Sequence, residues 1–322
     1  MVFLAFLGCA WLVCLAIYKA FPWIQPGSDL VYAAKLQRTT APSLFPDDAK
    51  NKRRVVIFGD SKVLCGFIPS RFDELSGGRT YSFNLGLPNA RHFVQELKTL
   101  CEHGQVPTDV LLTVPWSSNP PPTLRERLLD DEWLREQIAP FHHFPRDLLL
   151  FILRARRSGG IVASYRRAEA DVQTMLDQRG FYFIEGQSHF PNHQLPDDYV
   201  LQRDDPTAQH PRVLETSGPE FETLLELMKK YHFRVYFVPR YLRATEASQP
   251  PDFNVAVKEK LQGYPDIQVL GPDYVLYPNR YFSDIAHLNP TGAEEYTAYL
   301  WRLFEPQFTD KPATSAGSQQ ER

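Results

Sequence analysis

The chain has 322 residues, of which 43% are hydrophobic and 13% aromatic, and its formal net charge is −3. This composition allows one large domain with a hydrophobic core, and the slightly negative charge argues against a protein that binds nucleic acid. The four cysteines are too few for a disulfide framework, and Cys65 and Cys101 do not have metal-site spacing. We therefore expect buried free thiols, no metal and no cofactor.

The N-terminal residues 1–18 contain no charged side chain. At about 1.5 Å per residue, a helix of this length just reaches the roughly 30 Å of a bilayer core. We expect a single transmembrane anchor in residues 1–22. A cleaved signal peptide is the alternative, but neither a basic start nor an A-x-A motif is present. Lys19, Lys35 and Arg38 follow the segment, and the positive-inside rule taken alone would leave the domain in the cytoplasm.

After a polar, extended connector at residues 23–53, the pattern of residues 54–308 predicts a single α/β domain. Apolar runs typical of buried strands alternate with amphipathic helical stretches, which predicts a parallel sheet with helices on both faces, a three-layer α/β/α fold. The expected strands are 54–58, 80–84, 109–114, 234–239 and 268–270, and the expected helices are 90–103, one from 217 and one from Asn289-Pro290.

Residues 119–215 interrupt this alternation. They contain three consecutive prolines, a helix-like stretch at 145–157 and a loop-rich run at 185–212. Because long insertions in compact domains are usually functional or disordered, we expect a large insertion that lies over the sheet. Residues 309–322 are polar and are expected to form a disordered tail.

A serine stands at the end of the first predicted strand, in the sequence Gly59-Asp60-Ser61. Ser61 or Asp60 could simply cap the following helix. However, Asp284 and His287 stand three residues apart just before the last helix. A nucleophilic serine needs a general base, and the base needs an acid to orient it. Since sites gather at the carboxyl ends of parallel strands, we predict Ser61 as nucleophile, His287 as base and Asp284 as orienting acid.

The G-D-S motif after the first strand and the D-x-x-H motif before the last helix resemble those of the SGNH hydrolase superfamily, over about residues 54–115 and 216–305. The resemblance implies an oxyanion hole made by the N–H of Ser61, a second backbone N–H and a third side-chain donor. Asn89 takes the place of the glycine that usually gives the second donor, with Gly86 as the alternative. Ser117 stands where the family has asparagine, and Asn119 follows two residues later. This departure counts against a free-standing esterase, since loss of one oxyanion donor typically costs about 10²–10³ in rate.

The apolar N-terminus and the sequence DIAHLNPTGAEEY resemble membrane-anchored SGNH-like acyltransferases, of the alginate O-acetylation and D-alanyl-lipoteichoic acid transfer type. The resemblance implies acyl transfer, such as O-acetylation, onto a bacterial cell-surface or exported polysaccharide. The acyl donor would come through a multi-pass membrane acyltransferase, and the domain would face the periplasm or the cell exterior. The alternatives are an anchored or secreted carbohydrate esterase and a non-catalytic scaffold of a polysaccharide-export assembly.

Arg240 follows the fourth predicted strand at the same edge of the sheet. An arginine in this position could bind an anionic substrate, or it could form an ordinary surface ion pair.

Overall fold

The computed structural model describes residues 2–24, 27–40, 44–86, 93–113, 144–183, 188, 190–199, 218–244, 254–272 and 274–308. Within these residues, five strands form one sheet in the order β2-β1-β3-β4-β6, and every neighbouring pair is parallel. The strands are β1 (Arg53–Gly59), β2 (Thr80–Gly86), β3 (Asp109–Leu112), β4 (Arg234–Phe237) and β6 (Ile267–Val269). The parallel sheet predicted from the sequence is thus confirmed.

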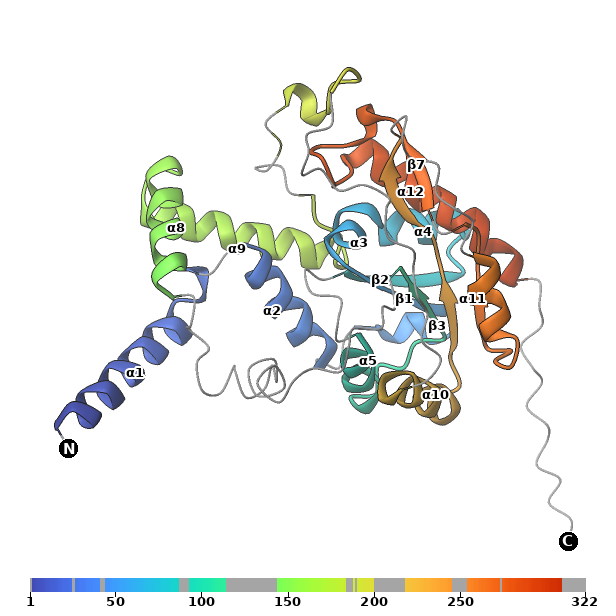
Figure 1. Ribbon diagram of the computed structural model, residues 1–322, viewed down its shortest axis with the longest axis horizontal. Helices are drawn as coiled ribbons and strands as arrows, with labels where there is room; N and C mark the ends of the chain where they lie inside the picture. Colours follow the sequence, from blue (N-terminus) through green and yellow to red (C-terminus); the bar gives the residue numbers. More distant parts are fainter. Residues whose placement is uncertain are drawn as a thin grey trace, which may run out of the picture.

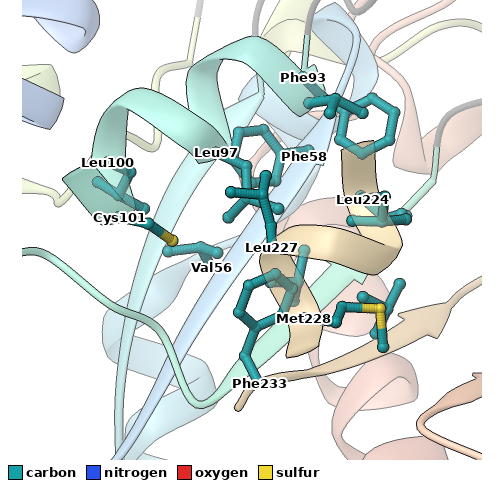
Figure 2. Close-up of a cluster of buried hydrophobic side chains, with 14 of the residues drawn as sticks. Val56, Phe58, Phe93, Leu97, Leu100, Cys101, Leu224, Leu227, Met228 and Phe233 are labelled. Atoms are coloured by element: carbon teal, nitrogen blue, oxygen red, sulfur yellow. The ribbon is translucent and has the colours of Figure 1, made fainter. Parts of the chain in front are cut away.

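Helices cover both faces of this sheet, which gives an α/β fold with three layers (Figure 1). Val56 and Phe58 of β1 belong to one core cluster, and Val55 and Ile57 belong to the other, because successive side chains of a strand point to opposite faces. The first cluster contains α5 (Phe93–Glu102) and α10 (Pro219–Tyr231), and the second contains α3 (Ser61–Gly66), α4 (Pro69–Leu75) and α12 (Pro290–Phe304). Figure 2 shows the side chains of α5 and α10 packed on Val56 and Phe58.

The central strand is apolar on both faces because both faces are buried. Val55, Val56, Ile57 and Phe58 are each at most 1% exposed. Such a continuous apolar run is typical of parallel strands and explains why β1 was readable from the sequence. Cys65 and Cys101 are also buried free thiols, as predicted.

A second, two-stranded sheet was not predicted. Strand β4 ends at Phe237, two residues earlier than expected, and Pro239 has no N–H to continue the ladder. The chain then forms β5 (Arg240–Arg243), which pairs in parallel with β7 (Tyr274–Tyr277). The remaining elements near this side are α11 (Asn254–Leu261) and the short 3₁₀ helices η6 (Asn279–Tyr281) and η7 (Glu305–Phe308).

The predicted extended connector is wrong in its conformation. Residues 23–53 contain the helix α2 (Gly27–Thr40), preceded by η1 (Pro22–Ile24) and followed by η2 (Asp47–Ala49). Val31 is 2% exposed and Lys35 is fully buried, because α2 packs against α5 and α9 (Ile161–Asp177). The sequence did not predict this helix because lysine is almost never fully buried, and a lysine at position 35 therefore indicates a solvent-exposed position.

The described part of the insertion contains α8 (Phe144–Arg157), as predicted, together with α9 and the short η5 (Pro191–His193). Helix α9 contacts α2, and α8 contacts α9 and η1. The α8–α9 hairpin therefore projects beside α1 (Val2–Ala20) and away from the sheet (Figure 1). The expectation that the insertion lies over the sheet is wrong for this hairpin.

Residues 1–22 were predicted to contain a membrane anchor. Val2–Ala20 is a helix, but among the described residues no helix is long and apolar enough to cross a membrane. The predicted tail at 309–322 lies outside the described residues.

Candidate active site

The structure brings Ser61, His287 and Asp284 into one hydrogen-bonded chain. His287 Nε2 lies 2.9 Å from Ser61 Oγ, and His287 Nδ1 lies 2.8 Å from Asp284 Oδ2. Ser61 begins α3 directly after β1, at the point where the sheet order reverses between β1 and β3. Such switch points at the carboxyl ends of strands are where open α/β sheets bind ligands. Ser61 and His287 are 226 residues apart in the chain, and the hydrogen bonds give the order serine, histidine and aspartate that a nucleophile, its base and an orienting acid require.

A tight turn before α12 places the acid and the base. Asp284 Oδ1 accepts hydrogen bonds from the N–H groups of Ala286 and His287, each at 2.7 Å. Aspartate commonly closes turns in this way, by bonding backbone groups two or three residues on. The N–H of Ser283 donates to the carbonyl of His287 at 2.8 Å and closes the other side of the turn. The second carboxylate oxygen of Asp284 is thereby left to face the imidazole.

The prediction that Asn289 opens the last helix is confirmed. Its side-chain oxygen accepts the N–H of Gly292 at 3.0 Å, and Pro290 occupies the first helical position. The turn that carries Asp284 and His287 is therefore anchored at one end by a capped helix that packs in the core.

Ser61 is not the cap of α3. Asp60 is the N-cap, and its Oδ1 accepts the N–H of Lys62 at 3.0 Å. The hydroxyl of Ser61 is instead directed at His287. The capping alternative for Ser61 is thus wrong, and the capping role proposed for Asp60 is confirmed.

The electrostatics of the site favour the ionised form of Asp284. Burial raises the pKa of Asp284, but the hydrogen bond and charge of His287 and the two backbone N–H donors outweigh it and lower the pKa below its usual value of 3.8. Asp284 is therefore ionised at neutral pH and accepts Nδ1–H. The other ring nitrogen, Nε2, then carries a lone pair that accepts the Ser61 hydroxyl proton. The side chains of His287 and Asp284 are 19% and 22% exposed, so a substrate can reach the site from solvent.

Asn84 holds the helix that begins with Ser61 by hydrogen bonds, a role that the sequence analysis missed. Its side-chain amide is fully buried and donates to the carbonyls of Val63 at 2.7 Å and Phe67 at 2.8 Å. Its Oδ1 accepts the N–H of Gly86 at 2.8 Å. Asn84 thus joins the end of β2 to the helix that carries Ser61. An asparagine between the apolar residues Phe83 and Leu85 near the end of the strand is the signal that would have identified it, since buried amides are retained where several bonds satisfy them.

Both backbone polar groups of Gly86 are hydrogen-bonded to buried side chains. Its N–H is bound by Asn84, and its carbonyl accepts Lys35 Nζ at 2.6 Å. The N–H is therefore not directed at the substrate, and the structure does not support Gly86 as an oxyanion donor. The glycine is needed for close packing instead, because a Cβ there would overlap the backbone of Leu64 and come within 2.7 Å of Val63 Cγ1.

The other predicted oxyanion groups lie outside the described residues. Asn89 falls in 87–92, and Ser117 and Asn119 fall in 114–143. For Ser61, no hydrogen bond to its backbone N–H is found within the described part of the chain. This is usual for the first N–H of a helix, and it leaves that group available to a ligand.

Arg240 forms an ion pair with Asp60, with Nη2 lying 2.6 Å from Oδ2. The structure therefore shows the ion-pair alternative for this residue. Lys62 lies close by, and burial together with the charges of Arg240 and Arg243 lowers its pKa to about 8, against the opposing charges of Asp60 and Asp284. Three basic side chains, those of Lys62, Arg240 and Arg243, therefore lie close to the two carboxylates of Asp60 and Asp284.

In the described ranges, no group of three or more histidine, cysteine, aspartate or glutamate side chains could hold a metal ion. Comparison of the chain with protein-family models, with curated proteins and with solved structures finds no match in any of the three. The functional argument therefore depends on the residues of the site and on their geometry.

Proposed function

We propose that the protein is a serine-dependent acyltransferase that acts through an acyl ester on Ser61. The observation that carries the proposal is the hydrogen-bonded chain from Ser61 Oγ through His287 to Asp284, with its two distances of 2.9 and 2.8 Å. These distances lie in the range expected of a nucleophile and base in contact.

In the first half-reaction, Ser61 Oγ attacks the carbonyl carbon of an acyl donor while its proton moves to His287 Nε2. Asp284 stabilises the imidazolium that results. The tetrahedral intermediate collapses when the bond to the leaving group breaks, and His287 returns the proton to that group. The acyl group is then joined to Ser61 Oγ as an ester.

In the second half-reaction, a hydroxyl group takes the place of the leaving group. It gives its proton to His287 and attacks the ester carbon, and the Ser61–acyl bond breaks as Ser61 regains the proton. The N–H of Ser61 is one donor to the negative oxygen in both steps. The N–H of Asn89 and the side chain of Ser117 or Asn119 are the proposed further donors.

The proposed acceptor is a sugar hydroxyl of a bacterial cell-surface or exported polysaccharide, and the acyl group is most simply acetyl. This part of the proposal is supported by the resemblance of the Ser61 and His287 motifs to those of SGNH-like acyltransferases. The uncharged residues 1–18 support a location at the cytoplasmic membrane beside a multi-pass acyl donor protein. We propose that the domain faces outward, so a C-terminal reporter that is active only outside the cytoplasm should be active. A reporter that works only in the cytoplasm would reverse this topology.

The nucleophile is tested by exposing the full chain to a fluorophosphonate and locating the adduct by mass spectrometry. We expect one adduct, on Ser61, that is absent in Ser61→Ala and forms far more slowly in His287→Ala. Ser70→Ala, which changes an exposed serine in the first turn of α4, is the matched control and should label normally. A folded wild-type protein that forms no adduct on Ser61 would contradict the proposal.

Transfer is separated from hydrolysis by loading Ser61 from an activated acetyl ester and then adding either buffer or de-acetylated alginate. A transferase releases the acetyl group faster with the polymer and leaves it on the polymer, whereas an esterase releases acetate rapidly in buffer alone. Full activity of Ser61→Ala in cells would instead indicate a scaffold, and both enzymatic functions would then be abandoned.

A further inference from the structure

The exposed large apolar side chains gather at one end of the molecule. Within the described residues, all of them lie in α1, at Phe21, in α8 or in the first turns of α9. In the α8–α9 hairpin they are Tyr165, which is 38% exposed, and six aliphatic residues that are each between 43% and 63% exposed. We call these six the hairpin tip: Leu149, Leu150, Ile152, Leu153, Ile161 and Val162. Concentrated exposed apolar surface of this kind usually marks an interaction site.

The hairpin is held in place by its other face. Phe151 and Ala155 are 3% and 5% exposed and cluster with Ile24 of η1. The ring of Trp23 lies 4.8 Å from that of Phe151 and 5.6 Å from that of Tyr165, so one indole joins both helices to the end of α1. The hairpin is therefore packed on one face, and the exposure of the tip does not come from a lack of packing. The inner face of the hairpin is packed against η1, and the apolar side chains of its outer face remain exposed.

The charge around the tip is predominantly positive. Residues 144–167 contain six arginines and one aspartate, a net charge of +5, whereas the whole chain carries −3. Asp147 is buried, and the exposed charged side chains of residues 149–167 are Arg156, Arg157, Arg166 and Arg167, with the exposed Glu169 two residues further along α9. Arginines that border exposed leucine and isoleucine, with tryptophan and tyrosine nearby, are the composition of helices that lie in a membrane interface.

We propose that the hairpin tip inserts its apolar side chains into the surface of a bilayer that contains anionic lipids. The leucine and isoleucine side chains enter the acyl region, and the arginines bind phosphate groups of the lipid heads. The tip lies beside α1 through η1, so the two would contact the same membrane surface. Binding of the tip would hold the domain in a defined orientation on the membrane. This membrane binding does not depend on the chemistry of Ser61.

The tip is tested by a fluorophore that reports water and lipid contact. Leu150→Cys is made in the full chain with Cys9→Ser and Cys14→Ser, since Cys65 and Cys101 are buried. The cysteine is labelled with nitrobenzoxadiazole, and the protein is reconstituted in vesicles of equal parts phosphatidylcholine and phosphatidylglycerol. Gln178→Cys, at the exposed opposite end of the same hairpin, is the matched control, and neither change removes a core side chain.

Lipids that carry a nitroxide in the acyl chain should quench the label at position 150 several-fold more than the label at position 178. The quenching at 150 should fall in vesicles of phosphatidylcholine alone and in Arg156→Gln/Arg157→Gln. Equal, weak quenching at the two positions would overturn the proposal. A label at 150 that is shielded from water but not quenched by these lipids would also overturn it, because a protein surface, such as a second copy of the chain, would then cover the tip.

Discussion

Replacing Asp284 by asparagine should reverse the tautomer of His287 while leaving the shape of the site unchanged. In the wild type, Oδ1 accepts two backbone N–H groups and Oδ2 accepts His287 Nδ1–H. An asparagine has only one oxygen, and that oxygen is required by the two backbone donors. Its NH₂ group must then face Nδ1, which can only accept. The proton moves to Nε2, which donates toward Ser61 Oγ and cannot take its proton.

The size of the effect follows from the two backbone bonds. Turning the amide the other way would restore the useful tautomer but would leave the N–H groups of Ala286 and His287 without an acceptor. Each unsatisfied donor costs about 1–3 kcal/mol, so the unproductive arrangement is favoured by about 2–6 kcal/mol. Acylation of Ser61 should therefore slow by about 30-fold to 10⁴-fold, and the upper end matches the typical loss when a triad acid becomes an amide.

The assay is the second-order rate of fluorophosphonate labelling of Ser61, measured with a thermal melt of the same sample. Asp266→Asn, which changes an exposed aspartate directly before β6, is the matched control and should label at the wild-type rate. If Asp284→Asn is folded and labels at that rate too, Asp284 does not set the tautomer, and the reasoning from its two backbone bonds is wrong.

Three further predictions concern the groups that hold the site. Burial lowers the pKa of Lys35 to about 7, so between about pH 7 and 10 the unfolded chain binds a proton that the folded chain does not. The free energy of unfolding should therefore rise with pH by up to about 1.4 kcal/mol per unit, and urea titrations of Lys35→Met should lack that rise; equal slopes would refute it. Asn84→Ala removes the partner of the Phe67 carbonyl and of the Gly86 N–H, and one of the two donors to the Val63 carbonyl. It should lower the free energy of unfolding by about 2 kcal/mol or more, whereas a loss below about 1 kcal/mol would contradict the network. Gly86→Ala pushes on the backbone of Leu64 and should slow labelling of Ser61, while Gly263→Ala, which meets nothing within 4 Å, should not.

The triad was predictable because its local chemistry is carried by short segments. An apolar run that ends in Gly59-Asp60-Ser61 marks a strand followed by a helix, and Asp284 closes its turn with groups only two and three residues away. Neither rule requires a distant contact. The expectation that the two segments meet came from the general geometry of parallel sheets.

The supporting residues were not predictable in the same way. Lys35 and Asn84 have ordinary polar side chains, and their roles depend on partners at other places in the chain. Lys35 meets the carbonyl of Gly86 51 residues away, and the hairpin of α8 and α9 is placed by its packing on α2 and η1. A polar side chain becomes structural only when burial removes water from it, and burial is decided by the whole fold.

By itself, the sequence determined the five strands of the main sheet, the chain order of Ser61, Asp284 and His287, and the local turn that presents Asp284 and His287. These follow from hydrophobic periodicity and from hydrogen bonds between near neighbours. Only the tertiary structure decided that Ser61 is not a helix cap, that Gly86 is bound by Asn84 and that the insertion carries its apolar tip beside α1. The physical reason is that each of these depends on which groups, distant in sequence, occupy the space around a side chain.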